Sequence, residues 1–74
     1  MAQQITPNRL RAWRTSRGLT LGDEADLTGL DVGFLSRLER GEREASPMTK
    51  VRIARGLGVR INEIFEPELA GVAK

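Results

Sequence analysis

Residues 18–41 read GLTLGDEADLTGLDVGFLSRLERG, a pattern that predicts two short helices joined by a tight turn. Thr20 followed three residues later by Asp23 forms a capping box, so we expect a helix to begin at residue 21. Gly29 ends this helix, because glycine readily adopts the left-handed conformation found after helix C-termini. Asp31 caps the second helix, which runs to about residue 40. The connection is so short that we expect the two helices to cross steeply.

The second of these helices presents a mixed apolar and basic face to solvent. Leu35 and Leu38 point into the core, and Ala25 on the first helix is small enough for a close crossing. The outward face then consists of Val32, Gly33, Ser36, Arg37 and Arg40. A tightly linked pair of this kind has the geometry of a helix-turn-helix, whose second helix lies in the major groove of DNA.

Three further helices are expected outside this stretch. Thr6 and Pro7 are typical of a helix start, and Gly18 would end this first helix. Ser46 and Pro47 form another start of this type, for a helix that ends before residue 58. A short helix over residues 61–65 follows, and the alternation typical of strands is missing.

The sequence therefore predicts an all-α fold, a compact five-helix bundle with a central helix-turn-helix. We expect an N-terminal arm over residues 1–6, a helix-turn-helix DNA-binding domain over 7–66 and a flexible C-terminal tail over 67–74. The apolar positions expected in the core are Leu10, Trp13, Leu19, Ala25, Leu30, Leu35, Leu38, Ile53, Leu57, Val59, Ile64 and Phe65.

Composition excludes several classes of function. The 74 residues suffice for one domain, and they contain neither cysteine nor histidine. The usual disulfides, metal ligands and general bases are therefore missing, so we predict no enzyme, no metal site and no cofactor. No apolar run is long enough for a membrane span, and the first residues do not resemble a signal peptide, so we expect a cytoplasmic protein.

The charged residues are arranged in blocks that the net charge of +2 conceals. Residues 1–20 contain four arginines and no acid, and residues 21–31 contain four acids and no base. Residues 32–60 are basic again, with seven cations against three acids. Arginine suits phosphates and guanine edges better than lysine does, which favours a nucleic-acid partner. The alternative is that these arginines only solvate the surface.

Several segments together resemble a known family. The segments NRLRAWR (8–14), GLTL (18–21), FLSRLERG (34–41) and IARGLGV (53–59) occur in the order typical of that family, with Ala25 and TGL (28–30) between them. Residues 8–65 accordingly resemble a Cro/CI-type (XRE-like) helix-turn-helix domain of the phage-repressor kind. The resemblance implies the fold described above and binding to double-stranded DNA.

The resemblance also implies roles for individual residues. Arg37 would contact guanine, and Val32, Gly33, Phe34 and Ser36 would complete the surface that faces the bases, unless Phe34 belongs to the core. Thr20 and Leu21 begin the helix whose N-terminal amides bind a phosphate in the family. Arg40 and Arg43 fall at or near positions that contact the DNA backbone. Arg14 and Glu39 would form an internal salt bridge that orients the groove-entering helix.

Helix 21–28 departs from the family pattern. Leu21 stands where many relatives have glutamine, Glu24 where the pattern has an inward leucine, and Leu27 where it has a polar residue. We expect this helix to rotate slightly or to pack loosely. Asp23, Glu24 and Asp26 are expected to form a solvated acidic face, which would also suit a basic protein partner.

These observations predict a sequence-specific transcriptional regulator that binds double-stranded DNA as a homodimer. The dimer surface would include Ile61, Ile64, Phe65, Leu69 and Val72, with the alternative that Ile64 and Phe65 close the core instead. The alternative function is a protein-interaction module, an antitoxin or an anti-activator that sequesters a toxin or a larger regulator.

Overall fold

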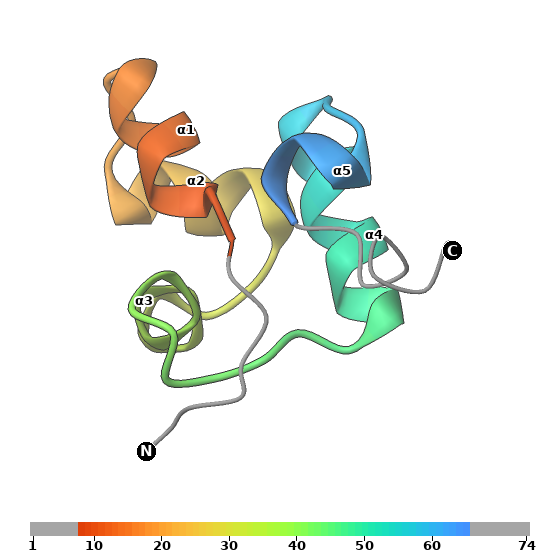
Figure 1. Cartoon of the computed structure of the whole chain (residues 1–74). Helices are drawn as coiled ribbons and strands as arrows, with labels where there is room; N and C mark the ends of the chain where they lie inside the picture. The colour runs from red at the N-terminus through yellow and green to blue at the C-terminus, as the bar shows by residue number, and fades with distance from the viewer. Residues whose placement is uncertain (1–7, 66–74) are drawn as a thin grey trace.

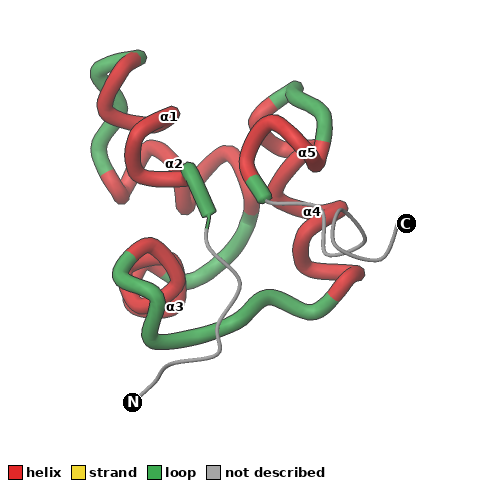
Figure 2. Tube along the Cα trace, viewed as in Figure 1, coloured by secondary structure: helices red, strands yellow, loops and turns green. Residues whose placement is uncertain are grey.

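The computed structural model describes residues 8–65, and this part of the chain is helical without a named strand (Figures 1 and 2). The five helices are α1 (Leu10–Ser16), α2 (Leu21–Thr28), α3 (Val32–Glu39), α4 (Pro47–Leu57) and α5 (Ile61–Ile64). The all-α, five-helix prediction is confirmed. The expected arm over 1–6 and tail over 67–74, with Leu69 and Val72, lie outside the described residues.

The local capping signals explain where three of these helices begin. Thr20 and Asp23 form the predicted capping box: the Asp23 N–H donates to Oγ1 of Thr20 over 3.0 Å, and the Thr20 N–H donates to Asp23 over 2.9 Å. Asp31 accepts a hydrogen bond from the Phe34 N–H at the start of α3, and Ser46 caps α4 in the same way. These starts are confirmed because each depends on contacts within a few residues.

The predicted start of α1 at Thr6 and Pro7 is wrong. The helix begins at Leu10, whose N–H donates to Oδ1 of Asn8 over 3.1 Å. The Asn8 side chain also donates to the Leu38 carbonyl at the end of α3 (3.0 Å), and residue 8 forms an isolated bridge with Phe65. These contacts between distant parts of the chain keep residue 8 extended, so the helix starts later than its local pattern indicates.

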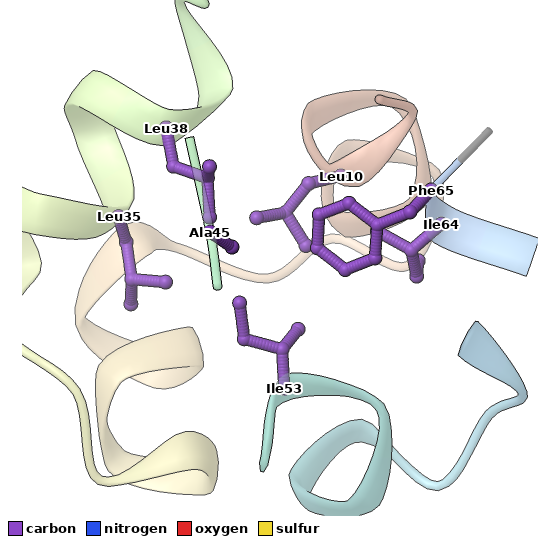
Figure 3. Close-up of a cluster of buried hydrophobic side chains, with 7 residues drawn as sticks. All are labelled: Leu10, Leu35, Leu38, Ala45, Ile53, Ile64 and Phe65. Atoms are coloured by element: carbon purple, nitrogen blue, oxygen red, sulfur yellow. The ribbon is translucent and has the colours of Figure 1, made fainter. Parts of the chain in front are cut away.

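The core lies where α1, α3, α4 and α5 meet (Figure 3). Its buried apolar side chains are Leu10, Leu35, Leu38, Ala45, Ile53, Ile64 and Phe65. Trp13, Ala25, Leu30, Leu57 and Val59 pack around it half-buried, and Leu19 is also half-buried. The burial of Ile64 and Phe65 confirms their predicted place in the core, so of the two alternatives given for them the dimer surface is wrong.

A residue of α4, Arg52, stabilises the turn between α2 and α3 by binding the end of α2. The Arg52 guanidinium donates through Nε to the Thr28 carbonyl at the end of α2 over 3.1 Å, and Gly29 takes the left-handed conformation with φ 75°. None of the described helices is long and apolar enough to cross a membrane.

Candidate nucleic-acid interface

Helix α3 has one buried and one exposed face. Leu35 and Leu38 are fully buried, whereas Val32 is 43% exposed and Arg37 and Arg40 are open to solvent. Gly33 and Ser36 are half-buried between these positions. The helix therefore presents apolar and cationic groups together along its solvent side, starting at its first residue.

The Arg37 guanidinium lies back over Gly33. A Cβ built at Gly33 would lie 3.9 Å from Nη1 of Arg37 and 2.9 Å from Oδ2 of Asp31. Among residues 8–65 the Arg37 side chain forms none of the ion pairs or side-chain hydrogen bonds that the structure contains. The absence of a side chain at Gly33 thus leaves room for a cation whose donors are available to a ligand.

Arg40 is engaged with its neighbours instead. Its guanidinium forms a two-pronged ion pair with Glu42 over 2.9 and 3.1 Å and also donates to the Ser36 hydroxyl. This pairing lowers the pKa of the Glu42 carboxyl. Both side chains are about half exposed, so the pair is weak and a phosphate can compete for the guanidinium.

Phe34 and Arg43 lie together at the other edge of α3. The Phe34 ring packs half-buried against the core, and the Arg43 guanidinium carbon lies 5.3 Å from the ring centroid. Phe34 therefore packs against the core and also contacts the Arg43 cation.

The N-terminus of α2 offers fewer amides than the sequence suggests. The Thr20 N–H is already bound by the Asp23 carboxylate, which also brings negative charge to this end of the helix. The N–H groups of Leu21 and Gly22 are left without an intrahelical partner, as at any helix start. A phosphate at this site would bind two amides next to an acid.

Arg14 and Glu39 connect α1 to α3. Nε and Nη2 of Arg14 donate to the two oxygens of Glu39 over 2.7 and 3.0 Å. Nη1 donates to the Leu19 carbonyl over 2.9 Å, which adds the segment before α2 to the same contact. The guanidinium fork thereby fixes α3 against α1 through a largely buried ion pair.

Glu24 corrects the expected acidic face of α2. Asp23 and Asp26 are exposed as expected, but the Glu24 side chain is 0% exposed and its Oε1 lies 4.0 Å from Nε of Arg14. Position 24 shares the inner face of α2 with Leu21 and Thr28, whereas Leu27 is 49% exposed. Burial and the negative charge of Glu39 raise the pKa of Glu24 to about 8.

No group of three acidic, histidine or cysteine side chains that could hold a metal ion occurs within residues 8–65. The features that the structure does assemble are a closely linked pair of packed helices, α2 and α3, an exposed basic face of α3 and the Arg14–Glu39 ion pair behind it. A family model described as helix-turn-helix matches residues 10–64, which include α2, the turn and α3.

The chain belongs to the helix-turn-helix family, in its Cro/CI (XRE-like) form. It is 38% identical over 58 residues to a protein of Deinococcus deserti named HTH-type transcriptional regulator DdrOP3. The match covers 78% of this chain and 45% of that protein, so the chain spans less than half the length of this relative. No solved structure matches the chain.

The sequence did not predict the structural roles of two residues, Arg52 on α4 and Glu24 on α2. Arg52, which binds the end of α2, lies 24 residues from its partner, and nothing local to it indicates this contact. The burial of Glu24 could have been inferred because the family pattern has an inward leucine at this position. A carboxylate, however, is rarely buried without a partner.

Proposed function

We propose that this chain is a sequence-specific DNA-binding transcriptional regulator that inserts α3 into the major groove. The observation that carries the proposal is Arg37, an exposed guanidinium on the outer face of α3 without an ion pair to a described residue. A guanidinium in this position matches the two acceptors of a guanine edge. The family membership and the name of the Deinococcus deserti relative support the same function.

The other side chains around α3 have complementary roles in this proposal. Val32 would contact a thymine methyl group, with Gly33, Ser36 and the edge of Phe34 beside it. Arg43 would bind the DNA backbone, and Arg40 would do so after exchanging Glu42 for a phosphate. The N–H groups of Leu21 and Gly22, next to the Thr20 cap, would bind one further phosphate.

We also propose that the protein acts as a homodimer, because one such module buries only about 600–1,000 Å² on DNA. An open groove between α4 and α5 is the proposed contact surface. Val51, Ala54 and Ile61 contribute apolar surface to this groove, and Arg55 and Arg60 also line it. Val51 is 36% exposed and Ile61 is 39% exposed, so a second copy would bury apolar surface now in water.

Selection of duplexes from a random-sequence pool, followed by affinity measurements at several salt concentrations, tests the main proposal. The selected duplex should bind more tightly than a scrambled one, and Arg37→Ala should reduce this preference by about 1–3 kcal/mol. Arg11→Ala removes the same charge from an exposed position on α1 and should leave the preference intact. Equal loss in both variants, or no preference for any duplex, would contradict the proposed role of α3.

A specific observation favours the second candidate, a module that binds a regulatory protein or a toxin. Asp23 and Asp26 are exposed on α2 and Leu27 is 49% exposed beside them, a surface that suits a basic partner. If this second function is correct, the selection should yield no preferred duplex, and a partner protein should co-purify with the chain. The variant Leu27→Ser should release that protein, and Arg37→Ala should retain it.

A further inference from the structure

The carboxyl group of Glu24 is buried where α1, α2 and α3 meet. Both of its oxygens are inaccessible and accept no hydrogen bond from the described residues, and the polar group close enough to accept one from a protonated Glu24 is the Glu39 carboxylate. Arg14 approaches from α1, and Glu39 lies on the α3 side. A buried polar group without a partner costs free energy, so its retention in the centre of a helix-turn-helix calls for a physical explanation.

The local charge balance explains the state of this carboxyl. Arg14 donates hydrogen bonds through Nε and Nη2 to Glu39 and through Nη1 to the Leu19 carbonyl. At 4.0 Å, Oε1 of Glu24 is too far from Nε for a hydrogen bond. One guanidinium therefore neutralises one carboxylate, and a second negative charge would remain uncompensated in a dry site. For this reason the pKa of Glu24 is raised, and the group holds a proton at neutral pH.

The remaining elements around α2 do not change this balance. Helix α4 also packs on α2, but its Arg52 binds the Thr28 carbonyl at the far end of the helix. The Thr28 hydroxyl donates to the backbone carbonyl of Glu24 rather than to its carboxyl group. Asp23 is exposed and engaged in the capping box. Arg14 and Glu39 are thus the charged groups that act on the Glu24 carboxyl.

We propose that Glu24 is a positioning residue for α3, which acts through the Arg14–Glu39 ion pair. While Glu24 holds its proton, Arg14 remains bound to Glu39 and α3 is fixed against α1. When the proton leaves at mildly alkaline pH, the carboxylates of Glu24 on α2 and Glu39 on α3 compete for the Arg14 guanidinium and repel each other. The helix that carries Arg37 then loses its fixed orientation. The consequence for DNA rests on the proposed function, whereas the change in α3 does not.

The composition of the chain makes it possible to assign a titration near pH 8 to Glu24. The 74 residues contain no histidine, cysteine or tyrosine, the side-chain types whose ordinary pKa values lie between about 6 and 10. Between pH 6.5 and about 9.5, the α-amino group is the other group of the chain expected to titrate. A proton that is released in this range and is coupled to α3 therefore identifies Glu24.

The first experiment follows the glutamate side-chain carboxyl carbons and the backbone amides of the whole chain by NMR between pH 5 and 9.5, without DNA. One carboxyl should titrate in the upper half of this range, and the amides of α3 should shift with the same midpoint. Glu24→Gln should abolish both changes, because glutamine retains the shape of the protonated acid. Asp26→Asn, an exposed change on the same helix, should preserve both.

Two results with the unsubstituted chain would overturn the proposal. One is that every glutamate carboxyl titrates below pH 6, and the other is that α3 does not respond when Glu24 titrates. If Glu24→Gln does not fold, Glu24→Leu serves in its place, since leucine fills an inward position without a charge. A titration of α3 that persists in the folded substituted chain would also exclude Glu24 as its source.

The second experiment measures the affinity for a selected duplex between pH 6.5 and 9.5 at constant salt. The affinity of the unsubstituted chain should fall above about pH 8, by at most about tenfold per pH unit, because one proton is linked to binding. Glu24→Gln should bind equally well across the range. A fall of equal size in both chains would contradict the positioning role. Failure to bind any duplex at any pH counts against the proposed function, and NMR then decides on Glu24.

Discussion

Gly56 in α4 packs directly against the backbone of Leu27 in α2. A Cβ built at Gly56 would lie 2.5 Å from the Leu27 carbonyl oxygen and 2.9 Å from Cα of Thr28. Side chains almost never approach a backbone so closely, and a backbone cannot turn aside as a flexible side chain can. The close approach of α2 to α4 therefore requires glycine at this position.

Replacing Gly56 with alanine should lower the free energy of unfolding by about 1–3 kcal/mol, because the added methyl group forces α4 away from α2. The loss occurs although alanine favours a helix interior by about 1 kcal/mol over glycine. Urea unfolding followed by circular dichroism measures the change. Gly22→Ala is the control, since a Cβ there meets Oγ1 of Thr20 at an ordinary 3.6 Å. Equal stability of the two variants would contradict the packing argument.

Removing Arg14 should destabilise the protein more than removing Glu39. Arg14→Met leaves two buried carboxyl groups without a cation, at a cost of about 3–5 kcal/mol at pH 7. In Glu39→Gln the guanidinium can turn toward Glu24, only 4.0 Å away, which recovers part of the loss. Chemical unfolding at pH 7 tests this order, and the opposite order would contradict the assignment.

Freeing Arg40 should strengthen binding to DNA. Glu42→Gln removes the carboxylate that now holds this guanidinium over 2.9 and 3.1 Å. Affinity for a duplex of any sequence should rise, because Arg40 no longer has to exchange Glu42 for a phosphate, and the slope of log affinity against log salt should stay nearly the same, because the number of phosphate contacts does not change. Fluorescence anisotropy measures both quantities. Glu63→Gln changes the net charge equally from an exposed position on α5, so an identical effect there would assign the gain to net charge alone.

Stability should decrease as the pH rises from about 5 to 8. The folded chain keeps the Glu24 proton until about pH 8, whereas the unfolded chain releases it near the ordinary value of 4.5. The unfolded state therefore binds fewer protons in this window, and the free energy of unfolding falls by at most about 1.4 kcal/mol per pH unit. Thermal unfolding across the range should show this slope in Asp26→Asn and lose it in Glu24→Gln. A slope that survives in Glu24→Gln would place the proton elsewhere.

A charge in the groove between α4 and α5 should weaken dimer formation. Val51→Glu puts an uncompensated carboxylate on apolar surface that the second copy would cover. Sedimentation velocity over a range of concentrations should show a shift toward the monomer. Met48→Glu is the matched control, since Met48 is more exposed on the same helix and does not line this groove. Unchanged association in Val51→Glu would exclude the groove as the dimer contact.

The N-caps of the helices are features that a single sequence is enough to predict. Thr20, Asp31 and Ser46 each start a helix through hydrogen bonds that span three residues, so their effect does not depend on the rest of the fold. The order of helices, the short turn at Gly29 and the inward leucines of α3 follow from these local signals. The order of the segments was likewise enough to indicate the family resemblance, and the resemblance implied the pairing of Arg14 with Glu39.

Other features depend on contacts between residues far apart in the chain. Helix α1 starts at Leu10 because Asn8 is bound to α3 and α5, and α2 approaches α4 closely because Gly56 meets Leu27. The burial of Glu24 was hidden for a related reason. A carboxyl group is normally solvated, and it becomes an internal group here because three helices close around it beside Arg14. Local hydrogen bonds could therefore be read along the chain, whereas these burial and packing effects arise once distant helices meet.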